Sequence, residues 1–512
     1  MGNNKNIKIK QNMKTKKLKR RNYLFIYCII SFIWILLVFI NPILAEELVI
    51  LHTNDFHGRI VSQNQKIFEK YEYEVAGAEY ISSIVNNIRT QEKNVLLLDA
   101  GDFSAGTIYS NLSYGQSVVD FYNYLNYDAV TLGNHEFDFG YEKFLNIVKN
   151  LKMPVLCANA NPLFKYTKPY IIINKNNLKI AVIGLLTPET EQITMPKVLN
   201  NHKILDPIET LNKYKSEILS NNPDLIIALT HLGVKEDEKL AKNVDYIDLI
   251  IGGHSHTTLY EPITVQNNNK NILIFQTGSY GKYIGYIKLN VNKNPKNIDL
   301  ISYKLYPTIN KIITPDNQIT KILKKYISDS EKYATEVLGQ SNTTFDKNSK
   351  DISNNLGTLI TNIMVYYTNS DIAFYNTGGI RDILNKGNIT YGQVFSILPF
   401  ENMLITVKMK GKDILELLNS MENKKTPLKY NSSLEFKENK WLLNGKEIQE
   451  DKEYKVATID FLYYGGDGYT EFKRYPVFEN YGYIRDIIAD YIKEHSPLND
   501  SFEPLKYLQS KK

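Results

Sequence analysis

The sequence predicts an α/β protein built from two domains behind an N-terminal leader. From residue 46 to about 312, short apolar segments alternate with helix-like stretches, the pattern of a layered α/β domain. Most of these segments are continuously apolar, as strands buried on both faces tend to be. Of the 512 residues, 43% are hydrophobic and 23% are charged, so the chain can bury large cores. This composition excludes collagen-like, coiled-coil and disulfide-scaffold proteins.

The first 45 residues predict a secretory leader. They contain nine Lys and Arg and no Asp or Glu, and an apolar segment at residues 23–40 precedes Ala45. A basic segment, an apolar core and a small residue are typical of a signal peptide, here cleaved after Ala45 to give a periplasmic or extracellular protein. The apolar segment of about 18 residues is also long enough to span a bilayer, so a retained N-terminal anchor is the alternative.

The rest of the chain is close to neutral. The formal net charge of +6 includes the nine positive charges of the leader, which leaves 52 basic against 55 acidic residues. We therefore expect no nucleic-acid polymer as a partner and, beyond the leader, no membrane. Cys28 lies in the leader, and we interpret the other cysteine, Cys157, as a small buried residue rather than a nucleophile.

Six apolar segments mark strands of the first domain, residues 46–312. They cover residues 48–51, 95–98, 129–132, 179–185, 225–229 and 249–251. Near residue 312 the pattern changes, and residues 316–337 predict one mostly polar helix within a linker at 313–337. Residues 338–512 then predict a smaller α+β domain, with a helix at 355–367 and glycine-containing turns at 376–379 and 465–468.

Potential metal ligands cluster just after the apolar segments. Five of the eight histidines do so, together with two aspartates and one asparagine. The group comprises Asp55, His57, Asp102, Asn134, His135, His231, His254 and His256. Taken singly, each could cap a helix or form a structural hydrogen bond. Because the carboxyl ends of parallel strands meet at one edge of a sheet, the group as a whole predicts a shared site.

These side chains predict two divalent cations and phosphoester hydrolysis. Imidazole, carboxylate and amide donors suit Zn, Mn, Fe or Co better than a thiolate-rich structural zinc site or an all-oxygen calcium site. Two such ions about 3.5–4 Å apart can share one carboxylate, clamp a phosphoryl group and acidify water. The other three histidines, His52, His202 and His495, lie outside the pattern, and we assign them no role.

The order of the motifs resembles that of the calcineurin-like metallophosphatases. Asp-x-His, Gly-Asp, Gly-Asn-His-Glu, His-x-Gly and Gly-His-Ser-His follow one another along the chain. The segments Leu-His-Thr-Asn-Asp-Phe-His-Gly and Gly-Asn-His-Glu-Phe-Asp are similar to those of the secreted 5′-nucleotidase family. This resemblance covers nearly all of residues 46–510. It implies a layered α/β/β/α metallophosphatase domain, a linker helix and a smaller α+β substrate-binding domain.

The resemblance also implies roles for the clustered side chains. One metal would be held by Asp55, His57 and His256, the other by Asn134, His231 and His254, with Asp102 bridging them. His135 would donate a proton or stabilise developing charge, and Asp138 would orient it.

By the same resemblance, the second domain supplies a nucleotide pocket. Phe400 and Phe461 would stack on the base, although an isolated Phe is more often a core residue. Asn402 would meet the edge of the base and Asp467 the ribose, whereas Asn376 and Arg381 would lie near the phosphate.

One position departs from the family pattern. Relatives commonly carry an arginine seven residues before Gly357, where this chain has Lys350. Lysine keeps the positive charge but lacks the planar fork of arginine, so we expect Lys350 to change phosphate affinity or substrate choice.

The resemblance implies hydrolysis of 5′-nucleoside monophosphates to nucleoside and phosphate, by in-line attack of a hydroxide generated at the metal site. Cleavage of 2′,3′-cyclic nucleotides, nucleoside di- and triphosphates or UDP-sugars is the alternative within the enzyme class. A catalytically idle surface protein that binds nucleotides or host partners is the alternative from another class. The sequence favours neither a monomer nor a homodimer.

Overall fold

The computed structural model describes residues 45–68, 70–194, 198–268, 270–293, 296–421, 424 and 426–510. The predicted leader lies outside the described residues. Among the helices within these ranges, none combines the length and apolar character needed to cross a membrane.

The first domain contains a seven-stranded sheet that includes the predicted N-terminal strand. Its strands, in spatial order, are β17 (Lys296–Pro307), β16 (Tyr283–Lys293), β1 (Glu46–Thr53), β4 (Val95–Asp99), β5 (Ala129–Thr131), β6 (Val155–Leu156) and β8 (Thr167–Lys168). Strands β1, β4, β5, β6 and β8 run parallel, and β16 and β17 add an antiparallel edge. Strand β4 is buried along its whole length, as its continuous apolar sequence predicts.

A second sheet of six strands lies against the first. Its strands, in spatial order, are β14 (Ile263–Asn267), β15 (Lys270–Phe275), β13 (Leu249–Gly252), β12 (Leu225–His231), β10 (Leu178–Leu186) and β9 (Tyr170–Lys175). Apolar side chains of both sheets, such as Ile50 and Leu96 from the first and Ile180 and Ile227 from the second, form one continuous core between them. All six apolar segments identified in the sequence are strands of these two sheets.

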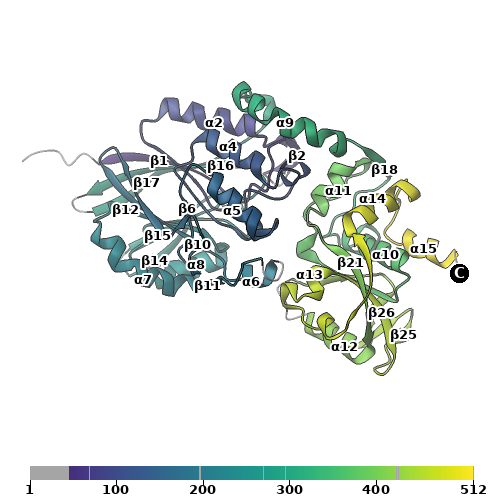
Figure 1. Ribbon diagram of the computed structural model, residues 1–512. Helices are drawn as coiled ribbons and strands as arrows, with labels where there is room; N and C mark the ends of the chain where they lie inside the picture. Colours follow the sequence, from purple (N-terminus) through teal and green to yellow (C-terminus); the bar gives the residue numbers. More distant parts are fainter. Residues whose placement is uncertain are drawn as a thin grey trace, which may run out of the picture.

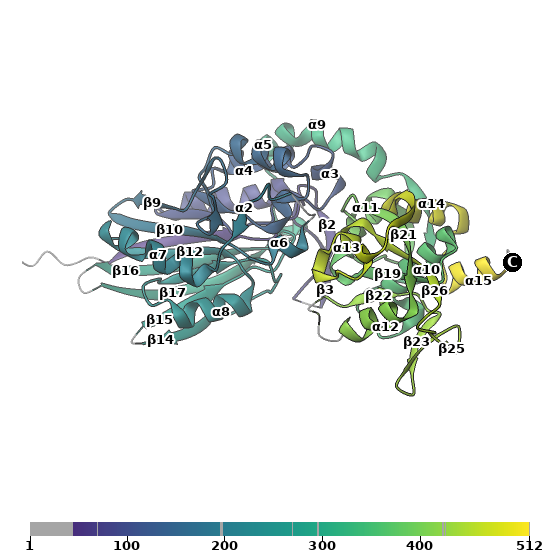
Figure 2. The same ribbon diagram turned by 60° about the horizontal axis from the view of Figure 1, so that its bottom comes forward.

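Helices cover the outer faces of the two sheets (Figures 1 and 2). The first sheet packs against α2 (Ala78–Gln91), α4 (Gln116–Leu125) and α5 (Tyr141–Asn150). The second packs against α7 (Pro207–Ser220) and α8 (Val234–Asn243). The layers are therefore α/β/β/α, which confirms the predicted architecture. Cys157 is fully buried in the core under the first set of helices, where burial raises the pKa of its thiol to about 12.

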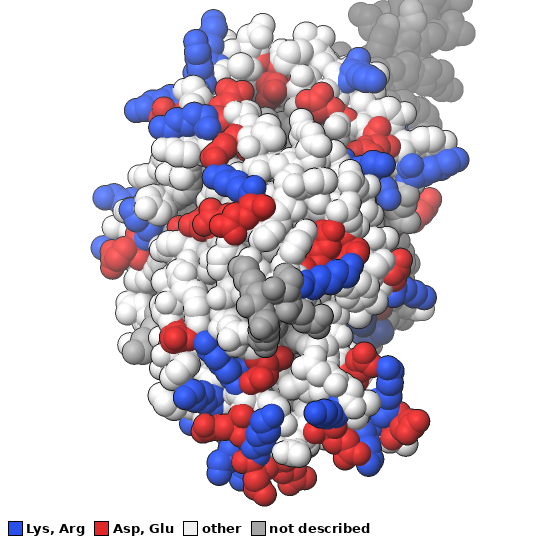
Figure 3. All heavy atoms as spheres, turned by 90° about the vertical axis from the view of Figure 1, so that its right-hand side faces the viewer, with Lys and Arg blue, Asp and Glu red and all other residues white. Residues whose placement is uncertain are grey.

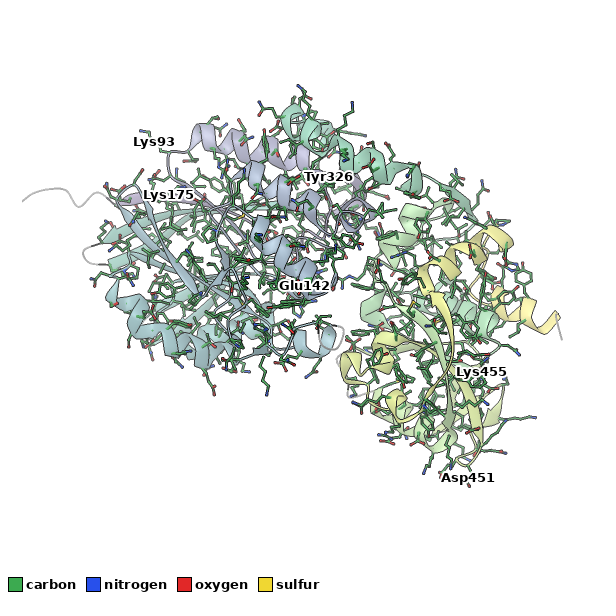
Figure 4. All side chains as sticks on the ribbon, viewed as in Figure 1. Lys93, Glu142, Lys175, Tyr326, Asp451 and Lys455 are labelled. Atoms are coloured by element: carbon green, nitrogen blue, oxygen red, sulfur yellow. The ribbon has the colours of Figure 1, made fainter. Side chains whose placement is uncertain are left out.

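The predicted linker helix is α9 (Asn317–Ala334), which runs along one side of both domains (Figure 1). Its apolar positions Ile319 and Leu323 are buried in the core of the first domain. The hydroxyl of Tyr326, labelled in Figure 4, donates to Asp120 of α4 at 2.7 Å. The N-terminal part of the linker is thus fixed to the first domain.

The second domain is built on a mixed five-stranded sheet. Its strands, in spatial order, are β22 (Leu428–Tyr430), β19 (Ile372–Asn376), β26 (Glu453–Ile459), β21 (Met403–Lys410) and β27 (Val477–Tyr483). The helices of this domain are α10 (Leu356–Thr368), α11 (Tyr391–Ile397), α12 (Gly411–Ser420), α13 (Asp460–Tyr463), α14 (Ile484–His495) and α15 (Glu503–Ser510). Acidic and basic side chains are interspersed over its outer face (Figure 3), in line with the nearly balanced charge of the chain after residue 45.

Smaller two- and three-stranded sheets complete the two domains. They pair β2 (Gln63–Ile67) with β3 (Tyr71–Val75), β7 (Ala160–Asn161) with β11 (Lys203–Ile204), β18 (Val337–Ser341) with β20 (Gly387–Thr390), and β23 (Leu434–Lys437) with β24 (Lys440–Leu443) and β25 (Lys446–Glu447). The three strands β23 to β25 project from the second domain (Figure 2).

Candidate dimetal and nucleotide site

The predicted metal ligands meet at the carboxyl ends of strands from both sheets of the first domain. They follow β1, β4 and β5 in the first sheet and β12 and β13 in the second, with His231 itself the last residue of β12. Several ligand residues hold a left-handed backbone that is costly for side chains other than glycine. These are Asp55, His57, Asp102, His254 and His256, with φ between 50° and 78°. Such strain persists only where the surrounding structure imposes it, and it concentrates at functional sites.

The side chains form two groups with a common member. Asp55, His57, Asp102 and His256 make one group of potential metal ligands, and Asp102, His231 and His254 make the other. In each group, the ligand atoms lie within 4.8 Å of one another. Asn134 joins the second group, since its Oδ1 lies 3.1 Å from Nδ1 of His254. These are the two sets expected from the sequence, with Asp102 shared between them.

The protonation pattern of these histidines fits metal ligands. Nδ1 of His57 and Nδ1 of His231 lie 3.2 and 2.7 Å from the carbonyl oxygens of Ala105 and Ala100, so each can donate its N–H outward. This leaves Nε2 of His57 facing Nε2 of His256 at 3.0 Å, and Nε2 of His231 facing Oδ2 of Asp102 at 3.1 Å. A histidine that donates one nitrogen to a carbonyl and directs the other at a cation is the usual metal-bound arrangement.

The pKa shifts of Asp102 and His231 also indicate a site that favours positive charge. Burial disfavours the charged carboxylate of Asp102, but the imidazoles of His231 and His135 outweigh it and hold the pKa of Asp102 well below its usual value. Burial likewise disfavours a charged His231, yet Asp102 raises the pKa of His231 to about 10. Protons and a cation would therefore compete for His231 Nε2. The donor types and their convergence fit two divalent cations.

His135 lies beside this cluster and is tied to Asp138. Its Nδ1 lies 2.8 Å from Oδ2 of Asp138, and its backbone N–H donates to Oδ1 of Asp102 at 2.8 Å. Burial works against a charged imidazole, but Asp138 and Asp102 together raise the pKa of His135 above its ordinary value. The ring also stacks on Phe400 of the second domain, with centroids 5.4 Å apart and planes at 18°.

Glu136, part of the Gly-Asn-His-Glu motif, was given no role by the sequence. Its buried carboxylate accepts hydrogen bonds from the backbone N–H groups of Gly133, Asp102, Phe103 and Ser104 at 2.7–3.1 Å. It thereby ties the loop that carries Asp102 to the loop that carries Asn134 and His135. The motif marked the residue, but its partners more than 30 positions away could not be read from it.

One cavity joins the metal cluster to the second domain. It has a volume of about 430 Å³ and is lined by Asp102, Asn134, His135, Asp138, His254 and His256 from the first domain. From the second domain it is lined by six residues that the sequence assigned to nucleotide binding: Asn376, Arg381, Phe400, Asn402, Phe461 and Asp467. Nη2 of Arg381 lies 3.2 Å from Nε2 of His57, and Nδ2 of Asn376 donates to Asp467 at 2.9 Å.

Lys350 does not share this placement. Its side chain is exposed, and it is absent from the residues that line the cavity. Lys347 instead lies behind the Arg381 loop, where its ammonium donates to the carbonyl of Ile380 at 2.5 Å. Burial, together with the nearby charge of Arg381, lowers the pKa of Lys347 to about 8. The structure therefore places Lys350 outside the cavity lining, whereas Lys347 lies close enough to Arg381 for the two charges to interact.

Glu189 of the first domain is another cavity residue that the sequence did not indicate. Its Oε2 lies 3.8 Å from Nε2 of His254, just before the short helix α6 (Thr190–Ile193). The histidines without an assigned role lie elsewhere. His52 is buried against Phe275 and Tyr303, His202 stacks on Phe164, and His495 packs against Tyr366.

Comparisons with known proteins agree with this geometry. Residues 48–258 match the calcineurin-like phosphoesterase family, and residues 334–474 match the 5′-nucleotidase C-terminal domain. The chain is similar to a 5′-nucleotidase of Vibrio parahaemolyticus, with 28% identity over 90% of this chain and 91% of the relative. It is also similar to a snake venom 5′-nucleotidase of Naja atra (29%, covering 87% and 96%) and to an apyrase of Tabanus yao (28%, covering 90% and 93%).

A solved structure shares the whole two-domain arrangement. The crystal structure of a 5′-nucleotidase precursor from Thermus thermophilus matches with a TM-score of 0.79 and 27% identity, over 88% of this chain and 96% of that one. The chain therefore belongs to the 5′-nucleotidase family, in which a calcineurin-like phosphoesterase domain precedes a 5′-nucleotidase C-terminal domain.

Proposed function

We propose that this protein hydrolyses 5′-nucleoside monophosphates to nucleoside and phosphate with two divalent cations. One observation carries the proposal: members of both groups of metal ligands and the nucleotide-type side chains line a single cavity of about 430 Å³. A cavity of this size suits a small-molecule ligand. The names of the relatives, which include 5′-nucleotidases, support the same reaction.

The chain offers a complete ligand set for two cations. Asp55, His57 and His256 would hold one, Asn134, His231 and His254 the other, and Asp102 both. Bound there, the cations would acidify a water molecule and neutralise charge on the phosphoryl oxygens. The donor set suits Zn, Mn, Fe or Co.

His135 and Arg381 would act on the phosphoryl group from opposite domains. A protonated His135, favoured by its raised pKa and held by Asp138, would stabilise charge on the phosphoryl or leaving-group oxygen, or donate a proton to it. The guanidinium of Arg381, next to His57, would bind phosphate oxygens with its planar fork.

The second domain would recognise the nucleoside. Phe461 and Phe400 offer aromatic faces for the base, and Asn402 offers an amide for its edge. Asp467, which accepts a hydrogen bond from Asn376, would bind the ribose hydroxyls. Export through the leader at residues 1–45 is also our proposal, and it would place this activity outside the cytoplasm.

A substrate panel tests the proposal. Purified protein supplied with Mn or Zn is assayed for phosphate release from AMP and ATP, and for cleavage of UDP-glucose and of a 2′,3′-cyclic nucleotide. We expect AMP to be the best substrate, and a preference for ATP would assign the apyrase activity named for the Tabanus yao relative instead. The proposed enzymatic activity is refuted if metal-loaded protein cleaves none of these four substrates.

A further inference from the structure

A buried arginine of the first domain has its only ion pair in the described residues with the second domain. Arg59 is 2% exposed, and its Nη2 donates to Oδ2 of Asp382 at 3.3 Å. Its Nε and Nη1 have no hydrogen-bond partner in the described part of the chain. The guanidinium also lies over the ring of Tyr280, 4.6 Å from the ring centroid. Neither Arg59 nor Asp382 has been assigned a role above.

This contact is linked to residues of the candidate site in both domains. Arg59 follows His57 by two residues, and the backbone N–H of Tyr280 donates to the carbonyl of Asp55 at 2.7 Å. On the other side, Asp382 directly follows Arg381, whose carbonyl accepts from the Tyr280 hydroxyl at 3.1 Å. Arg59, in the loop that carries Asp55 and His57, and Tyr280, which is hydrogen-bonded to that loop, therefore contact two successive residues of the second domain. We call Arg59, Tyr280, Arg381 and Asp382 the interdomain clasp.

The charge pair in the clasp favours the closed arrangement of the two domains. A buried guanidinium is costly unless a carboxylate compensates it, and Asp382 is the carboxylate that does so here. Separation of the domains would leave Arg59 with neither this partner nor another ion pair among the described residues. In the closed arrangement, the second domain thus supplies the carboxylate that compensates the buried guanidinium of Arg59. Asn111, which donates to the carbonyl of Pro399 at 3.1 Å, adds a neutral contact across the same boundary.

We propose that Arg59 and Asp382 are positioning residues that favour domain closure and fix Arg381 beside the metal cluster. The part concerning Arg381 rests on the proposed function, because it assumes that Arg381 binds the phosphoryl group. The part concerning closure does not, because it requires only that the two domains separate more readily without the charge pair.

A distance measurement tests closure without any catalysis. Spin labels are attached to cysteines introduced at the exposed Lys235 of α8 and Lys446 of β25, in the full chain with Cys28→Ser. Cys157 is buried with a raised thiol pKa, so it should remain unlabelled. In metal-free, nucleotide-free protein, Asp382→Asn should shift the interdomain distance distribution to longer values, and Asp382→Glu should restore it. The matched control is Asp500→Asn, which removes a partly exposed ion pair with Lys506 inside the second domain. Identical distributions for the parent, the control and Asp382→Asn overturn the proposal.

Kinetics test the placement of Arg381. Asp382→Asn should lower kcat/KM about tenfold, as expected for loss of a partly buried charge pair, and equally for AMP and p-nitrophenyl phosphate, because the defect lies at the phosphoryl group. Asp382→Glu should recover most of the loss. A loss confined to AMP, or no recovery with glutamate, would overturn the assignment to Arg381 positioning. A parent protein that is inactive on every nucleotide would refute the proposed function. The distance measurement would still decide whether the clasp favours domain closure.

Discussion

Replacing Asp138 with asparagine is the most direct test of how the reaction centre works. The substitution keeps the shape of the side chain that lies 2.8 Å from His135 Nδ1 but removes its charge. Both side chains are mostly buried, with 11% and 18% exposed, so solvent screens the pair little. A hydrogen bond to a charged group contributes about 1.5–3 kcal/mol. If this stabilisation is needed only when His135 carries its proton in the transition state, kcat should fall about 10- to 150-fold.

The assay is kcat at saturating AMP, with metal content measured on the same samples. Glu142→Gln, an exposed carboxylate on α5 labelled in Figure 4, is the control and should retain turnover within about twofold. Metal content should stay at the parent level, because Asp138 is outside both ligand groups. Unchanged turnover in Asp138→Asn would refute the role of Asp138. A loss of turnover in proportion to lost metal would show that Asp138 supports the metal site instead.

Three further predictions concern the pocket, the shared ligand and a buried acid. Phe461→Ala should raise KM for AMP by about 5- to 150-fold, the range for loss of base stacking, and leave p-nitrophenyl phosphate unaffected; equal effects on both would indicate a core residue. Asp102→Ala should remove both cations in metal analysis, and retention of either would contradict a shared ligand. Burial raises the pKa of Asp99 from 3.8 to about 8, so the folded protein holds this proton more tightly than the unfolded chain does. The free energy of unfolding of the parent should therefore fall as the pH rises from about 4 to about 8. The Tm of Asp99→Asn should not show this fall, and parallel Tm profiles of the two proteins would refute the role of Asp99.

The sequence was most informative where a strand is buried on both faces. Strands such as β4 and β12 are continuous apolar runs, and the site lies at their carboxyl ends, so Asp102 and His231 could be located from the runs alone. Strand β17 was missed because its burial alternates irregularly, with several exposed positions. Its place beside β16 depends on antiparallel pairing that a local apolar pattern does not encode.

Residues whose role depends on distant partners were also missed. Glu136 and Arg59 act through groups more than 30 and more than 300 positions away, respectively. Lys350 lies outside the cavity lining for a local reason. The side-chain amide of Asn355 donates to the carbonyls of Lys347 and Ser349, so the loop folds back on itself and Lys347 turns inward. The number of residues between a side chain and a motif does not determine how the loop between them folds.

A cavity walled by two domains also constrains how products leave. The stack of His135 on Phe400 and the contact of Arg381 with His57 cross the domain boundary beside the cavity. Product release that proceeds by separation of the domains would break contacts that assemble the site, and a tighter assembly would then lengthen the time that products are retained. Solvent viscosity should slow turnover when this opening step is rate-limiting, and weakening the boundary would then speed release while slowing chemistry.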